Sequence, residues 1–155
     1  MINILDEANI EELLQQQIIG HLGCHADETT YVVPISYAYD GENIYAHTHE
    51  GKKIDMMRKN PKVCFQVDDL TDLSDWKSVI IMGEFKELTD NEERKGAMQH
   101  LLKRELPLKT TTTTHIGEMW PFDTNSIDIK GIVFKIKITE KNGRAEQNDS
   151  SYKKW

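Results

Sequence analysis

Two adjacent lysines, Lys52 and Lys53, stand where the chain could bind a phosphate group. They follow Gly51 after a predicted strand and lead into a short predicted helix. Backbone N–H groups at a helix start are unpaired and carry partial positive charge, so they attract an anion. Lysines are unfavourable at this end of a helix dipole, and a bound anion would resolve that conflict. The residues alone leave two interpretations open, a phosphate site or a pair of solvated surface lysines.

Two histidines, His47 and His49, precede the lysines at the end of a predicted strand. Because they are two residues apart, their side chains point to the same face of the strand. Such a pair can bind a metal, but a metal site needs further ligands and none stands at a fixed spacing nearby. The sequence therefore favours polar packing at a strand end and predicts no metal site.

Two tryptophans are candidates for lining a pocket. Trp76 opens a strand that also carries Ser78, and its ring could cover the end of a barrel or line a planar cofactor. Trp120 lies in an apolar loop segment that is consistent with a pocket wall, a dimer contact or plain packing. Neither Cys24 nor Cys64 adjoins a helix start that would lower the pKa of its thiol, so both are expected to be structural.

Hydrophobic periodicity predicts three helices and about six strands that position these residues. The helices are expected after an Asp6 cap, over 54–60, and from a Thr89 cap through Leu106. The strands are expected at Ile18–Cys24, Tyr31–Tyr39, Asn43–Thr48, Lys62–Asp68, Lys77–Leu88 and Ile127–Thr139.

Single residues refine this prediction. Pro34 cannot donate a ladder hydrogen bond, which places its strand at an edge or interrupts it there. Asp40 and Gly41 form a tight-turn pair between two hairpin strands, and Gly83 predicts a bulge. A polar loop is expected over 69–75.

The expected fold is mainly β, an antiparallel barrel that is closed or partly closed and carries peripheral helices. A parallel doubly wound sheet is the weaker alternative, because strands and helices do not alternate regularly. One domain is predicted over residues 1–139, followed by a polar C-terminal tail over residues 140–155.

Composition excludes several classes of protein. The 155 residues suit one domain, and the net charge of −7 argues against a general nucleic-acid binder. No apolar run approaches the roughly 20 residues of a membrane span. The first residues lack the basic region of a signal peptide, and two cysteines form no disulfide framework. We therefore expect a cytoplasmic protein without membrane or nucleic-acid partners.

Three ordered motifs resemble the pyridoxamine 5′-phosphate oxidase-related flavoproteins, in particular the branch that contains the nitroimidazole-resistance proteins. They are Tyr45–Lys53, Asn60–Asp68 and Trp76–Val79. The resemblance extends over Ile18 to Leu88 and is weaker in the C-terminal third. It implies a six-stranded antiparallel split β-barrel that dimerises, with a flavin at each of two interface sites.

The resemblance also implies roles for individual residues. Lys52 and Lys53 would hold the flavin phosphate, helped by Thr48 and the Gly51 backbone, and His47 would sit near the ring or the phosphate. Trp76 and Ser78 would approach the flavin from the neighbouring subunit, with Trp120 as a further candidate. The residues that would run beside the isoalloxazine are Val33, Pro34, Ile35 and Ser36.

The function implied by the resemblance is that of a homodimeric oxidoreductase with FMN, or alternatively FAD, as cofactor. NADH or NADPH would reduce the flavin, which would then reduce a small electron acceptor. Two alternatives stay open, a flavin-binding or storage module without turnover and a haem-handling protein. Oxidation of pyridoxamine phosphate itself is not expected, because the C-terminal segment has only Arg144 in place of the family's basic substrate-binding segment.

Overall fold

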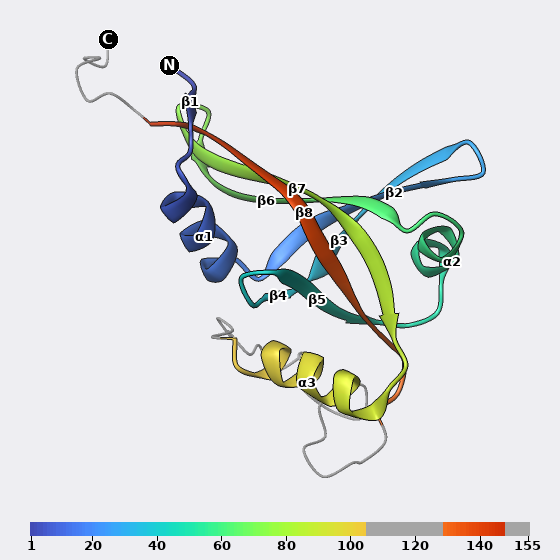
Figure 1. Cartoon of the computed structure of the whole chain (residues 1–155). Helices are drawn as coiled ribbons and strands as arrows, with labels where there is room; N and C mark the ends of the chain where they lie inside the picture. Colours follow the sequence, from blue (N-terminus) through green and yellow to red (C-terminus); the bar gives the residue numbers. More distant parts are fainter. Residues whose placement is uncertain (105–128, 148–155) are drawn as a thin grey trace, which may run out of the picture.

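One strongly curved antiparallel sheet with three helices at its margins forms the part of the molecule that the structure describes (Figure 1). The computed structural model describes residues 1–104 and 129–147. The helices are α1 (Glu7–Gln16), α2 (Lys52–Lys59) and α3 (Asn91–Leu102). The strands are β1 (Asn3–Ile4), β2 (Ile19–Ala26), β3 (Thr29–Ser36), β4 (Ala38–Tyr39), β5 (Asn43–Thr48), β6 (Lys62–Asp72), β7 (Asp75–Leu88) and β8 (Ile132–Glu146).

The sheet curls until its two ends meet at Tyr37. The strand order is β3-β2-β6-β7-β8-β5-β4, and β1 pairs with β8. The terminal strands of this order, β3 and β4, are consecutive in the chain and separated only by Tyr37. The Tyr37 amide donates to the Ile18 carbonyl at 2.9 Å, and its hydroxyl donates to the Leu14 carbonyl at 2.8 Å. The predicted split barrel is confirmed, although two of the eight strands, β1 and β4, have only two residues.

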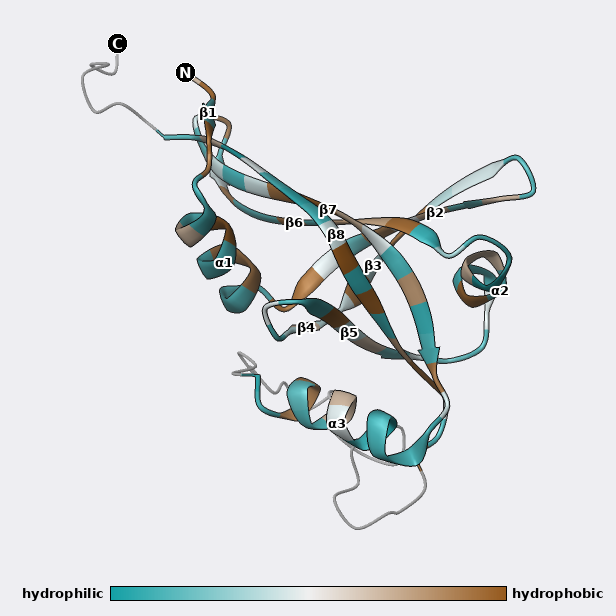
Figure 2. Cartoon of the chain, viewed as in Figure 1, coloured by the Kyte–Doolittle hydropathy of each residue, from teal (hydrophilic) through white to brown (hydrophobic). Residues whose placement is uncertain are grey.

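The core lies inside this curl and follows from strict alternation along the strands. In β6 the alternate residues Val63, Phe65 and Val67 are buried, as their spacing predicts. Figure 2 shows the same alternation of hydrophobic and hydrophilic residues along the β7–β8 ladder. The ring of Tyr37 packs edge-on against Phe65 with 5.2 Å between centroids, which ties the point where the sheet ends meet to the centre of the core.

The caps of two helices test the sequence prediction. Asp6 caps α1 as predicted, because its carboxylate accepts the Asn9 amide at 2.9 Å. The predicted Thr89 cap of α3 is wrong, since Asp90 accepts the Glu93 amide at 3.2 Å and shifts the helix start by one residue. The helix also ends at Leu102 rather than at the predicted Leu106.

The predicted strand Tyr31–Tyr39 is broken at Tyr37. Its first part becomes β3, which pairs with β2 and lies at the sheet edge, as Pro34 indicates. Its last two residues become β4, and the Asp40–Gly41 turn joins them to β5 as predicted.

The predicted polar loop over 69–75 is wrong, because β6 and β7 continue into it as a hairpin. The longer β7 offers partners to residues beyond Thr139, so β8 runs to Glu146 and part of the predicted tail is strand. The predicted irregularity at Gly83 is found as a register shift between Met82 and Gly83, but the extra residue is Thr139 on the partner strand β8. Of the helices in the described part of the chain, none is long and apolar enough to cross a membrane.

Candidate functional site

The lysine pair lies in the first turn of α2, at an end that no side chain caps. The N-cap residue Gly51 is extended, with φ of 171°, and contributes only its backbone. The first amides of an α-helix have no intrahelical partner, so this end presents N–H donors together with two ammonium groups. Lys52 Nζ lies 4.9 Å from the ring centroid of Tyr31, which places the pair beside the edge strand β3.

Arg58, in the last turn of α2, binds the carboxylates of Glu50, which precedes the helix, and of Glu87. Its guanidinium donates to both carboxylate oxygens of Glu50 at 2.9 Å and to those of Glu87 at 2.9 and 2.8 Å. The hydrogen bonds from Arg58 lower the pKa of Glu87. Within the described ranges, neither Lys52 nor Lys53 has an ion pair with a carboxylate. The first turn of α2 also contains Asp55, which forms no ion pair with either lysine, so both ammonium groups are available to a phosphate dianion.

The buried thiol of Cys24 also responds to the charges of Lys52 and Lys53. Burial raises the pKa of the Cys24 thiol, and the charges of Lys52 and Lys53 oppose that rise. Cys24 is the β2 partner of Tyr31 on β3. Both lysine charges therefore act on a group of the β2–β3 pair.

The segment Val33–Ser36 is the C-terminal half of β3. Val33 and Ile35 are half-buried toward the core, whereas Pro34 and Ser36 are exposed on the outer face. Because β3 is an edge strand, one side of its backbone is not used by a neighbouring strand. This arrangement suits a flat ligand that lies along the edge and pairs with main-chain groups.

Ser78 belongs to a polar network on the outer face of the sheet. The Gln66 amide donates to Ser78 Oγ at 3.0 Å and to Asp68 Oδ2 at 2.9 Å, and Gln66 Oε1 lies 3.1 Å from His21 Nδ1. Since His21 is the β2 partner of Pro34, the network connects the edge strand to Ser78 across the sheet. The sequence alone did not indicate His21 and Gln66 as neighbours of the site.

Trp76 is half-buried at the hairpin end of β7, opposite Leu70. In Figure 1 this end of the sheet lies beside the N-terminus, far from α2. The fold therefore does not bring Trp76 together with Lys52 and Lys53 within one chain. Trp120 lies outside the described residues.

His47 and Thr48 point to opposite sides of β5. Thr48 has the inward register of Ile44 and Ala46, while His47 Nε2 donates to the Lys130 carbonyl at 2.5 Å. Burial lowers the pKa of His47, which keeps its ring neutral at pH 7. The structure therefore places Thr48, but not His47, on the side of the strand that faces the interior.

The outer face around Pro34 and Ser78 also exposes large apolar side chains. These side chains point outward from β2, β3 and β7. They are Ile19, Val32, Ile80 and Met82, and their exposed fractions are 55%, 62%, 50% and 46%. We call these four residues the outer apolar face. Several large apolar side chains exposed on one face of a sheet make that face a candidate interaction surface.

A hollow of about 530 Å³ opens beside Ser36, between α1 and α3. Its apolar lining includes Leu14 and Tyr37, and the described residues that line it include the cations Lys103 and Arg104 but no carboxylate. Neither this hollow nor a second one on β7 and β8 is lined by the lysine pair.

Arg104 is the residue of this hollow that the sequence did not indicate. Its Nη1 donates to Ser36 Oγ and to the Tyr37 carbonyl, each at 2.6 Å, and its Nε donates to the Leu101 carbonyl at 2.8 Å. Burial lowers the pKa of this guanidinium, which has no carboxylate partner in the described part of the chain. It thus presents a cation next to the end of the Val33–Ser36 segment.

Residues 6–145 match the family model described as pyridoxamine 5′-phosphate oxidase. The match extends over most of the chain, and the protein belongs to the pyridoxamine 5′-phosphate oxidase family. The resemblance found in the sequence motifs is confirmed, and so is the split-barrel fold.

The solved structures that resemble this chain include flavin proteins. A FAD-binding protein from Mesorhizobium loti has a TM-score of 0.72 and 29% identity, with 95% of this chain and 99% of that chain covered. A 5-nitroimidazole antibiotic resistance protein from Bacteroides thetaiotaomicron has a TM-score of 0.72 and 19% identity, with coverage of 94% and 87%, and supports the fold.

A curated relative matches a shorter part of the sequence. An uncharacterised protein of Rhizobium meliloti is 41% identical over 70 residues, which are 45% of this chain and 46% of that protein. The matched region thus spans about half the length of this relative.

Proposed function

We propose that the protein binds a flavin mononucleotide whose phosphate lies at the start of α2. The observation that carries this proposal is the pair Lys52 and Lys53 at an uncapped helix start, without an ion pair among the described residues. Two ammonium groups and the helix amides together match the charge and the hydrogen-bond acceptors of a phosphate dianion. Thr48 and the Gly51 backbone complete this end of the site.

The isoalloxazine would lie along β3 and accept hydrogen bonds from the free side of its backbone. Val33–Ser36 runs along the sheet edge, and Tyr31, two residues earlier, already contacts Lys52. A flavin whose phosphate binds Lys52 and Lys53 would therefore have its ring system beside this segment. FAD is the alternative cofactor, and its adenosine would extend beyond the phosphate end.

We further propose that two copies of the chain complete the site through the outer apolar face. Ser78 shares this face, and Trp76 lies at the hairpin end of β7, away from α2 of its own chain (Figure 1). A second copy docked face to face would cover the four exposed apolar residues and bring its Trp76 and Ser78 to the flavin of the first. Light scattering should therefore report a dimer, and a monomer that keeps full flavin affinity would contradict this arrangement.

The proposed activity is electron transfer from NADH or NADPH to a small acceptor. A bound flavin supplies the two-electron redox chemistry, while the chain binds and orients it and excludes water from the ring. The hollow beside Ser36 adjoins the end of the flavin segment and offers room of about 530 Å³, with the Arg104 cation in its lining. It is the place where a small acceptor would meet the ring.

The purified protein provides the test. We expect a yellow protein with flavin absorbance, whose chromophore is identified by mass spectrometry after heat release. Mixing it anaerobically with NADH or NADPH should bleach that absorbance. A colourless protein that takes up neither FMN nor FAD would refute the proposal, an intense Soret band would indicate haem, and bound flavin that neither donor bleaches would indicate a binding or storage module.

A further inference from the structure

The hollow beside Ser36 has charged lining residues of one sign only among those that the structure describes. It lies between α1 and α3, which stand on either side of β4 in Figure 1. The C-terminal end of α3 contributes His100, Lys103 and Arg104, and the end of α1 contributes the amides of Gln15–Gln17. All of these polar groups can donate hydrogen bonds, so the lining is suited to an acceptor-rich ligand.

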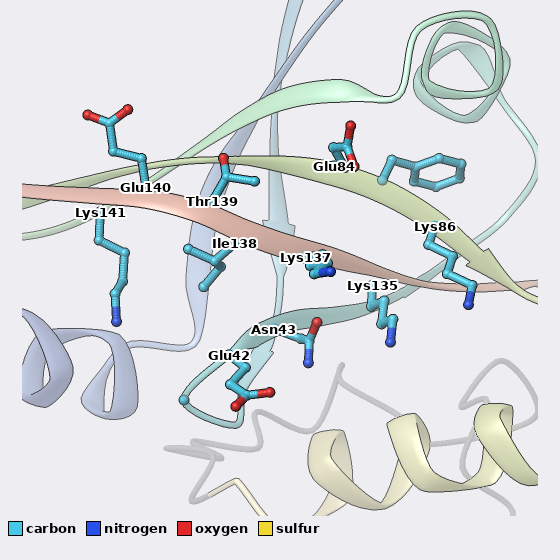
Figure 3. A pocket seen from close by; sticks show the side chains of 12 residues that line it. Glu42, Asn43, Glu84, Lys86, Lys135, Lys137, Ile138, Thr139, Glu140 and Lys141 are labelled. Carbon is cyan, nitrogen blue, oxygen red and sulfur yellow. The ribbon is translucent and has the colours of Figure 1, made fainter.

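The hollow on β5, β7 and β8 is larger, at about 750 Å³, but its charges compensate each other (Figure 3). Its lysines stand among the carboxylates of Glu42, Glu84 and Glu140, and Glu84 is the direct β7 partner of Lys137. An excess of cations over carboxylates among the described lining residues therefore distinguishes the hollow beside Ser36.

Acids on the neighbouring elements do not pair with these cations. Glu11 of α1 accepts the hydroxyl of Tyr39, which lines the hollow, but its ion pair is with Lys141. Within the described ranges, no ion pair joins Lys103 or Arg104 to a carboxylate. This hollow is thus lined by unpaired cations in a chain whose net charge is −7.

Arg104 is fixed in position by the backbone around it. Its Nε and Nη1 donate to the carbonyls of Leu101 and Tyr37 and to Ser36 Oγ, which together orient the guanidinium plane. Its Nη2, in contrast, has no acceptor among the described residues. A half-buried guanidinium has lost part of its hydration, so an anion that accepts from Nη2 would offset that loss.

We propose that this hollow binds the carboxylate of a small organic acid through Arg104 and that, given the flavin proposed above, this acid is the electron acceptor. A volume of about 530 Å³ is in the range of small-molecule pockets, and Leu14 and Tyr37 offer apolar surface to the organic part. Because Arg104 contacts Ser36 at the end of the flavin segment, the anchored acid would lie next to the ring. In the reaction the acceptor gains the hydride that NADH or NADPH loses and a proton from water, while its carboxylate is unchanged.

Calorimetric titration with benzoate and benzamide tests the recognition of charge, because the two probes share a ring and differ in charge. Wild type should bind benzoate about tenfold or more tightly than benzamide, and R104Q should lose this preference. The matched control K95Q removes an exposed cation of the same helix outside the hollow and should keep the preference.

A thermal melt without probe shows whether R104Q folds. K103Q changes an exposed lining residue, so it leaves the fold intact and should weaken benzoate binding about threefold. Equal binding of the two probes by wild type, absence of benzoate binding, or equal affinities of K103Q and K95Q for benzoate would overturn the proposal.

Two further measurements separate this inference from the flavin proposal on which its second part rests. In K52A/K53A, which lacks the proposed phosphate ligands, the preference for benzoate should persist, and its loss would place the benzoate at α2 and overturn the assignment to Arg104. In flavin-loaded wild type, benzoate should shift the flavin absorbance, because the hollow adjoins the Val33–Ser36 segment. Benzoate binding without such a shift would overturn the role of the acid as acceptor.

Discussion

The guanidinium of Arg58 holds the carboxylate of Glu50 through two hydrogen bonds of 2.9 Å. It binds Glu87 as well, so one arginine in the last turn of α2 pairs with two acids. Glu50, two residues before Lys52 in the chain, is thereby paired with Arg58 rather than with Lys52 or Lys53. Arg58 therefore acts as a positioning residue for the proposed phosphate site without contacting the phosphate itself.

Replacing Arg58 with Ala should weaken FMN binding about fivefold, because a freed Glu50 can neutralise the lysine pair at a cost of about 1 kcal/mol. Fluorescence titration of FMN measures the change. Adding Glu50→Gln to R58A should restore part of the affinity, since it removes the competing carboxylate. Equal affinity of R58A and wild type would show that Arg58 does not control these charges.

The stability of the fold should fall in alkaline solution through Tyr39. Burial and the hydrogen bond to Glu11 raise the pKa of Tyr39 to about 12 in the folded protein. A group whose folded pKa is raised contributes stability that is complete below its unfolded value of about 10 and is lost as the pH rises toward 12. Lys141 acts in the same direction, because hydrogen bonds to Glu11 and Tyr39 outweigh burial and raise its pKa as well.

Urea unfolding at pH 8, 10 and 11.5 measures this dependence. The unfolding free energy of wild type should drop between pH 10 and 11.5. In Y39F the drop should be smaller, because the phenol that titrates is absent. An identical pH profile of the two proteins would place the alkaline transition elsewhere.

The two candidate caps of α3 can be separated by mutation. Asp90→Ala should lower the unfolding free energy by about 1 kcal/mol, because the Glu93 amide loses its acceptor. Thr89→Ala removes the neighbouring candidate and should change it by less than about 0.5 kcal/mol. Chemical unfolding of both variants decides the question, and the reverse ranking would restore the Thr89 cap.

The parts of the fold that the sequence predicted are those in which local pattern and burial agree. The alternation of Val63, Phe65 and Val67 predicted a strand because one face of β6 is in the core. The tip of the same hairpin, up to Asp72, was missed because both of its faces are polar or exposed and its strand state comes from pairing with β7. The cap of α3 was predicted one residue too early because Thr89 and Asp90 are adjacent and both residue types are good N-caps.

The candidate site was predictable to the same extent. The Lys52–Lys53 pair was visible because glycine, lysines and helix start are adjacent in the chain. The contact of Arg104 with Ser36 joins residues 68 positions apart in the chain, so no local sequence pattern predicts it. The same holds for His21 and Gln66, which meet only through the β2–β6 register.

Calorimetric titration of the double variant K52A/K53A with FMN tests the phosphate site most directly. Wild type is the reference, and the control is K62Q/K95Q, which removes two exposed lysines outside α2. Two charge-assisted contacts of about 1.5–3 kcal/mol each predict a loss of FMN affinity of about 100-fold or more. The control should bind FMN as wild type does. If K52A/K53A folds normally and keeps wild-type affinity, the start of α2 is not where the flavin phosphate binds.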